Sequence, residues 1–226
     1  MMIKKIDIPS IRDSVYMQMR EMILDGVWAP GTRIDLNQLA AEFGVSKTPL
    51  NEAIQMLIRE GILAVKPRSG TFVSALDLDE ILETFDFRLI LEKGAAEAIL
   101  ANASAPILRG LETLNDRMAE IAENPGSLED YRRMLRLDDE FHQKIMFLSG
   151  NAQLIEHYEQ LSARLMLMRM IGTFSPKDYK ATISDHRAIL AALRSGEWEA
   201  FSAASATHVA NAKAKVRRGL GSASTK

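Results

Sequence analysis

The stretch that decides the fold is Leu-Ala-Ala-Glu-Phe-Gly-Val-Ser-Lys-Thr-Pro-Leu-Asn-Glu-Ala, residues 39–53. A short apolar helix pattern over 36–43 stops at Gly44, and Ser46 is a favourable N-cap for a second helix. Two short helices joined by a tight glycine turn are typical of a helix-turn-helix. The second helix carries an apolar face at helical spacing, which predicts that it packs inward through Leu50, Ala53, Ile54 and Leu57.

Helical and strand patterns on both sides of residues 39–53 indicate that the helix pair belongs to a larger domain. A helical pattern that is opened by Ser10 and closed at Gly26 precedes it, and Pro30-Gly31 marks a turn. Two short apolar stretches follow it, at 62–65 and 71–73, and they flank a turn segment that predicts a β-hairpin. Residues 1–75 are therefore predicted to form a winged helix-turn-helix.

A helix-turn-helix places the start of its second helix in the major groove of DNA, where phosphates and base edges lie within reach. Asn51 can make a two-point hydrogen bond to adenine, and the other polar side chains there can contact phosphates. The residues predicted to contact DNA are Arg33, Ser46, Lys47, Thr48, Asn51, Arg68 and Gly70. The alternative is an ordinary helix pair of an all-α protein, in which Lys47 and Arg68 are simply solvated.

Composition limits the other function classes. The chain of 226 residues suits two domains, and 28 basic against 30 acidic residues give no bulk positive charge that would attract nucleic acid. The absence of cysteine excludes disulfide frameworks, Cys zinc sites and thiol nucleophiles. No signal peptide and no membrane-spanning segment is recognised, so we expect a cytoplasmic protein without a membrane partner.

The remainder of the chain is predicted to be an all-α antiparallel bundle, which makes the fold class mainly α. Helical patterns are separated by short polar or glycine- and proline-containing breaks, and short connections favour antiparallel neighbours. We assign 78–217 to this bundle and 218–226 to a disordered tail. The predicted helices span 79–102, 105–123, 127–149, 151–171, 178–195 and 197–216.

The bundle contains a candidate metal centre. Asp138 and His142 are four residues apart and share one helix face, while His186 and His208 each lie among apolar residues at helical spacing. Carboxylate and imidazole suit zinc, nickel, manganese or iron(II). A histidine on an apolar face is more often a core residue bonded to a carbonyl, and the spacing alone does not prove that three helices converge. Asp139 is a nearby alternative ligand that sits off this face.

The first domain resembles the DNA-binding domain of GntR-family bacterial transcription regulators. The resemblance rests on residues 26–34 and 39–53, on Glu60-Gly61-Ile62-Leu63 and on Gly70-Thr71-Phe72-Val73. The family usually has arginines, which read guanines, at the positions of Lys47 and Asn51. Lysine lacks the guanidinium fork and asparagine prefers adenine, so we expect an operator that departs from the family consensus.

The second domain resembles the FCD ligand-sensing domain of the FadR-like branch of that family. The resemblance rests on the segment Asp138 to His142, on Ser149-Gly150-Asn151, on the segment Asp185 to Leu190 and on a late helical histidine. It implies that a divalent metal, with zinc, nickel and manganese the leading candidates, is held by Asp138, His142, His186 and His208. It also implies that small carboxylates coordinate this metal.

An arginine often lines the effector cavity in this branch, and Arg88 matches it. Its structural alternative is an ion pair with Glu92 along the same helix, and Arg164 is a weaker effector-binding candidate.

These inferences combine into a homodimeric transcriptional regulator, expected to be a repressor. Its affinity for operator DNA would change when a small organic acid binds in the helical domain. Two copies on one symmetric site gain affinity through effective concentration, which offsets the low net charge. Two alternatives stay open: a regulator whose metal is purely structural and has no effector, and a metal-dependent enzyme, against which no general base is apparent.

Overall fold

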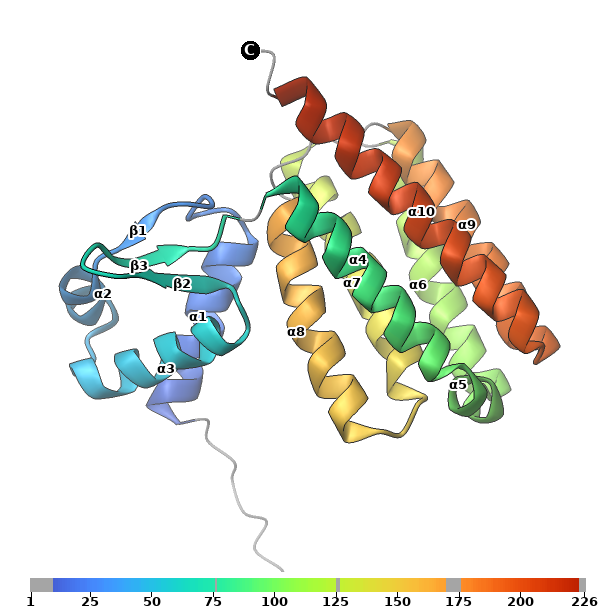
Figure 1. Cartoon of the computed structure of the whole chain (residues 1–226), viewed down its shortest axis with the longest axis horizontal. Helices are drawn as coiled ribbons and strands as arrows, with labels where there is room; N and C mark the ends of the chain where they lie inside the picture. The colour runs from blue at the N-terminus through green and yellow to red at the C-terminus, as the bar shows by residue number, and fades with distance from the viewer. Residues whose placement is uncertain (1–9, 76, 125–126, 170–175, 224–226) are drawn as a thin grey trace, which may run out of the picture. The chain divides into compact units, whose positions relative to one another are not determined.

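The computed structural model describes residues 10–75, 77–124, 127–169 and 176–223. The chain divides into two compact units, Met1–Ala75 and Leu76–Lys226 (Figure 1). Each unit has a hydrophobic interior of its own, so each is described separately.

The described part of the N-terminal unit consists of helices beside a small antiparallel sheet (Figure 1). The strand order is β1-β3-β2, and β3 lies in the middle because Phe72 pairs with Arg33 on one side and with Ala64 on the other. The first strand has two residues, too few for a sequence pattern, and was not predicted. The elements are α1 (Ile11–Leu24), β1 (Arg33–Ile34), α2 (Leu36–Phe43), α3 (Lys47–Arg59), β2 (Leu63–Lys66) and β3 (Gly70–Val73).

Local chemistry fixes the helix pair. The Asp35 carboxylate caps α2 by accepting hydrogen bonds from the backbone amides of Asn37 and Gln38. Gly44 ends α2 with φ +64°, in the left-handed region that favours glycine. The buried face of α3 consists of the residues predicted from its spacing: Leu50, Ala53, Ile54 and Leu57.

Polar contacts join the first and third helices. The Tyr16 hydroxyl donates a hydrogen bond to the Glu60 carboxylate, and Arg20 Nε lies 3.4 Å from the other carboxylate oxygen. Glu60 follows the last residue of α3, so these contacts hold the end of that helix against α1. These contacts lie at the end of α3, while Lys47 and Thr48 at its start are exposed to solvent.

The described part of the second unit is helical. The pattern over 79–102, predicted as one helix, is split at Ala95 into two. Its elements are α4 (Leu78–Gly94), α5 (Ala96–Asn102), α6 (Ala105–Glu123), α7 (Leu128–Phe147), α8 (Ala152–Arg169), α9 (Pro176–Ser195) and α10 (Trp198–Ala223).

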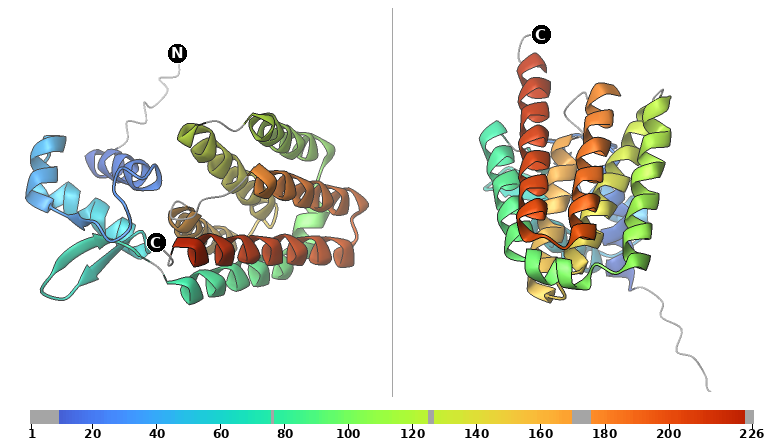
Figure 2. Two further views of the ribbon diagram at one scale, coloured as in Figure 1. Left: turned by 90° about the horizontal axis from the view of Figure 1, so that it is seen from above. Right: turned by 90° about the vertical axis from the view of Figure 1, so that its right-hand side faces the viewer.

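The long helices form a closed ring. Contacts run from α4 to α10, then to α9, α6, α7 and α8, and from α8 back to α4. Figure 2 shows these helices packed lengthwise around a common interior, with the short α5 at one end. Large apolar side chains fill much of that interior, including Phe141, Tyr158 and Phe201. Any polar residue that points inward from this ring is therefore removed from water.

The end of the chain differs from the prediction. Helix α10 continues to Ala223, so the expectation of a disordered tail over 218–226 is wrong for residues 218–223, while 224–226 lie outside the described residues. Arg218 Nη2 lies 2.8 Å from the Asp178 carboxylate, and this ion pair attaches the last turns of α10 to α9. The polar composition of residues 218–226 gave no sign of the contact between Arg218 and Asp178.

None of the described helices is both long enough and apolar enough to cross a membrane.

The turn between α2 and α3 provides a test of the helix-turn-helix. Gly44→Ala should lower the free energy of unfolding of the N-terminal unit by about 1–2 kcal/mol, because an L side chain is strained at this positive φ. Gly44→Asn is the matched control and should cost clearly less, since asparagine tolerates the left-handed region. Urea unfolding followed by Trp28 fluorescence in a Trp198→Phe background measures both. Equal losses would argue against a conformational cause.

Candidate metal centre and DNA-reading surface

Four side chains predicted as metal ligands come together in the interior of the helical ring. Asp138 and His142 come from α7, His186 from α9 and His208 from α10, and each offers one ligand atom within 4.8 Å of all the others. All four residues are buried, with exposed fractions between 0% and 4%. Asp139, the alternative ligand, is not in this group, and its carboxylate accepts a hydrogen bond from Gln143.

The spacing of these atoms suits a single ion. His142 Nε2 lies 3.1 Å from His186 Nε2, which in turn lies 3.3 Å from Asp138 Oδ1. Opposite ligands of an ion with bonds of 2.0–2.1 Å are about 4.2 Å apart, so a small contraction would bring the whole set into range. His208 Nε2 is buried and has no hydrogen-bond partner among the described residues, as a nitrogen reserved for a metal would be.

The protonation state of the histidines also fits metal binding. Burial lowers the pKa of His142 well below its usual value. Burial likewise lowers the pKa of His208 to about 4, although Asp185 acts in the opposite direction. Both imidazoles are therefore neutral near pH 7, with a nitrogen lone pair available to an ion.

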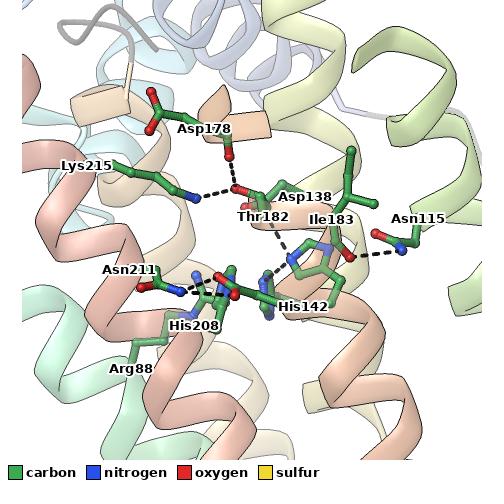
Figure 3. A network of polar contacts seen from close by, with 12 residues as sticks. Arg88, Asn115, Asp138, His142, Asp178, Thr182, Ile183, His208, Asn211 and Lys215 are labelled. Carbon is green, nitrogen blue, oxygen red and sulfur yellow. Dashed lines mark hydrogen bonds and ion pairs between the residues drawn. The ribbon is translucent and has the colours of Figure 1, made fainter. Parts of the chain in front are cut away.

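Carboxylates lie behind two of the imidazoles. The Asp185 carboxylate lies 3.5 Å from His208 Nδ1 and accepts hydrogen bonds from Asn211 Nδ2 at 3.0 and 3.1 Å (Figure 3). On the opposite side, Glu92 Oε1 lies 3.7 Å from His142 Nδ1. Carboxylates in this position commonly fix the ring orientation of metal-binding histidines.

The roles of four residues around the cluster were not predicted from the sequence. Asp185 directly precedes a ligand and Asn211 follows another by three residues, so proximity in sequence was the available signal. Tyr158, whose hydroxyl donates to Glu92 Oε1 at 2.8 Å, had no such signal. Phe141 stacks on the ring of His186 at 4.1 Å between centroids, which restricts that imidazole further.

The two effector-binding candidates differ in their surroundings. Arg88 is buried and its Nε donates to Glu92 Oε1 at 2.8 Å, so the predicted alternative, an ion pair along α4, is present. Its Nη2, however, is buried without a hydrogen-bond partner among the described residues, which leaves a donor for an anion. Arg164 on α8 is partly buried, and its Nε likewise has no hydrogen-bond partner among the described residues. No contact links it to the four-residue cluster in the part of the chain described. Its effector role stays a prediction.

A cavity adjoins the cluster. Its volume is about 50 Å³, and it is bordered by Asp138 and His208 from the cluster. Its walls are mainly apolar and aromatic, with Phe85, Met134 and Tyr179 among them. A small molecule in this space would touch the ligand set directly.

The predicted DNA-contacting residues lie on two exposed parts of the N-terminal unit. Ser46, Lys47, Thr48 and Asn51 are all exposed at the start of α3, and the Ser46 side chain makes no capping hydrogen bond there. Arg33 and Arg68 are exposed on β1 and at the wing tip. The Arg33 side chain lies against Gly70, where an added Cβ would meet its Nε at 3.3 Å, so the glycine gives this arginine its place beside the wing.

Comparisons with known proteins agree with both units. The family model of bacterial regulatory proteins of the gntR family matches residues 11–73, and that of the FCD domain matches residues 83–211. An HTH-type transcriptional regulator in an unstable DNA locus of Streptomyces ambofaciens is 29% identical over 198 residues, covering 88% of this chain and 81% of that protein.

Two solved structures share the fold. Escherichia coli McbR/YncC matches with a TM-score of 0.77 at 23% identity, covering 93% of this chain and 99% of that one. The metal-free FCD domain of TM0439 matches with a TM-score of 0.54 at 21% identity, covering 66% of this chain and 99% of that one.

A helix-turn-helix unit followed by an FCD unit defines a class of two-domain transcription factors. The chain belongs to the GntR family of bacterial regulatory proteins and carries an FCD domain. It is therefore a transcriptional regulator, like the relatives it matches, and not an enzyme.

The exposed Asn51 generates a prediction about base preference. Asn51→Arg should change the base selected at one operator position in each half-site from adenine to guanine, because arginine pairs with O6 and N7 of guanine. Selection of binding sites from a random DNA library measures this change. Gln18→Arg is the control, since it adds the same charge at an exposed position of α1. An unchanged preference in Asn51→Arg would show that this position does not read a base.

Proposed function

We propose that this regulator is a homodimeric, metal-containing repressor whose affinity for operator DNA changes when a small organic acid binds in its helical unit. The observation that carries the proposal is the buried cluster of one carboxylate and three imidazoles beside a cavity. A purely apolar core would be simpler to fold, because burying polar groups without partners costs free energy. The buried cluster therefore favours a bound ligand over a role in packing alone.

The ligand set would consist of Asp138, His142, His186 and His208. When bound, a divalent ion would supply a Lewis-acid centre that a carboxylate can join as a further ligand. Zinc, nickel and manganese fit a set of one carboxylate and neutral imidazoles. Asp185 and Glu92 would hold two of the imidazoles in their binding orientation from behind.

Arg88 would supply the positive charge that an organic acid needs besides the ion. Its Nη2 donor is unpaired within the described residues, while its Nε is held by Glu92. This division gives the guanidinium a fixed orientation and still leaves a donor for an incoming carboxylate. The cluster and Arg88 together favour an anion over a neutral molecule.

The DNA side of the proposal rests on placed side chains and not on bulk charge. Nine basic and eight acidic residues occur up to Leu76, so the unit has almost no net charge. Two copies on a symmetric operator would gain affinity from effective concentration, which supports a homodimer. Effector binding can change DNA affinity only through a different affinity of the effector for two arrangements of the dimer.

A combined experiment tests this function. Metal analysis of the purified protein should find close to one divalent ion per chain, and chelation should lower the melting temperature. In a thermal-shift screen, some organic acids should stabilise the metal-loaded protein but not the chelated one, and the same acids should weaken binding to the operator in a gel-shift assay. Stabilisation by no acid, with the metal present, would favour a purely structural ion.

The outer carboxylate on α9 provides a sharper test of the metal centre. Asp185→Asn should weaken metal binding about 10–100-fold, because the orientation of the His208 imidazole is then less well fixed. Competition with a chromogenic chelator measures the affinity. Asp139→Asn is the matched control, since it removes the same charge from a carboxylate outside the cluster. Equal affinities of the two variants would argue against the orienting role of Asp185.

A further inference from the structure

The rear nitrogens of the three imidazoles in the cluster have unequal surroundings. Glu92 lies behind His142 Nδ1. Asp185 lies behind His208 Nδ1. His186 contacts the cluster through its Nε2, and its Nδ1 is buried without a hydrogen-bond partner among the described residues. One of the three imidazoles thus lacks a counterpart of the carboxylates that lie behind the other two.

An acceptor without a partner lies on the neighbouring helix α6. Asn115 is only 2% exposed, and its Nδ2 donates a hydrogen bond to the carbonyl of Ile183 on α9 at 3.3 Å. Its Oδ1 is buried and accepts no hydrogen bond within the described part of the chain. Figure 3 shows the Asn115 amide extending toward Ile183. Because a buried acceptor without a partner costs free energy, we looked for a donor near this oxygen.

The bond to Ile183 brings the amide close to His186. Ile183 precedes His186 by three residues, which corresponds to about 4.5 Å along the helix axis. The carbonyl groups of an α-helix point toward its C-terminal end, so the Ile183 oxygen is displaced from its own Cα toward the level of His186. The His186 side chain in turn leans toward the N-terminal end of α9. Both directions reduce the separation between the Asn115 amide and the His186 imidazole along α9.

We infer that Asn115 is a positioning residue for His186: its Oδ1 accepts a hydrogen bond from the Nδ1–H of that imidazole when Nε2 binds the ion. A neutral imidazole that binds an ion through Nε2 carries its proton on Nδ1, and a buried donor needs an acceptor. The Ile183 carbonyl already accepts from Asn115 and, as part of α9, from the helix backbone. This inference rests on the proposed function, because it extends the set of residues that hold the proposed metal centre.

A neutral amide suits the charges around the cluster. Asp138, Glu92 and Asp185 already provide three carboxylates in or behind the ligand set. An amide oxygen can orient an imidazole without adding a further buried charge, which would cost free energy. Through Asn115, α6 joins a centre whose ligands come from α7, α9 and α10.

The zinc affinity of the full-length protein tests the role of Oδ1. Asn115→Leu removes the acceptor at similar side-chain size, and it should weaken zinc binding at least about tenfold, because the His186 ring is then less well fixed. Competition with a chromogenic chelator measures the affinity. Asn102→Leu is the matched control, since the Asn102 amide also donates to a backbone carbonyl, that of Leu148 at 2.8 Å, but lies outside the cluster. Equal affinities of the two variants would overturn the inference.

Asn115→Asp separates the acceptor from the donor. Aspartate keeps an acceptor oxygen but loses the NH₂ group that donates to the Ile183 carbonyl. We expect a zinc affinity at least as high as that of the wild type, together with a lower melting temperature of the chelated protein. A loss of zinc affinity as large as that in Asn115→Leu would show that Asn115 acts only through Ile183, and this result would overturn the inference.

A measurement on the wild-type protein covers the case in which the variants do not fold. In the zinc-loaded protein with isotope-labelled histidine, NMR detects the Nδ1–H proton of each bound imidazole. The His186 proton should resonate downfield, as those of His142 and His208 do, because a hydrogen bond to oxygen shifts it in that direction. A His186 signal at the position of an unbonded imidazole N–H would overturn the inference. A protein that binds no zinc would contradict the proposed function itself, which is distinct from zinc binding that does not depend on Asn115.

Discussion

The helical unit depends on the burial of polar side chains at the centre of a ring of helices. Asp138, His142, His186 and His208 have lost their water, and each must find partners within the protein or in a ligand. Their contacts with one another cross between α7, α9 and α10, so the cluster also sets how these helices lie together. A site that joins three helices in this way is suited to couple the binding of a small molecule to helix packing.

Glu92 links the cluster to Arg88, the residue predicted to bind an effector. Glu92 contacts Arg88, Tyr158 and the rear nitrogen of His142, so one carboxylate serves an arginine, a phenol and an imidazole. The sequence offers the pairing of Arg88 with Glu92 as an alternative to a role in anion binding. The geometry makes the two compatible, because the pairing uses Nε and leaves Nη2 without a partner among the described residues.

The two units differ in where their candidate functional side chains lie: exposed in the N-terminal unit and buried in the helical unit. The N-terminal unit keeps its polar side chains at the surface of α3 and of the wing, where phosphates and base edges can reach them. The helical unit places its polar side chains inside, where a low dielectric strengthens their interaction with an ion or an acid. The proposed function would use both, since DNA is a large external partner and a small effector would be enclosed in the helical unit.

The sequence by itself determined the elements whose causes are local. The glycine turn and apolar spacing of residues 39–53 predicted α2 and α3, and the four-residue spacing of Asp138 and His142 placed both on one helix face. The break at Ala95 and the helical course of residues 218–223 were not predicted from the local pattern.

Only the tertiary structure decided which distant residues meet. Periodicity shows that His186 and His208 face inward, but not that they meet the same point as Asp138, because helix packing fixes that distance. The same reason explains why Tyr158 was not predicted. It contacts Glu92 on another helix, and a single helix carries no information about its neighbour.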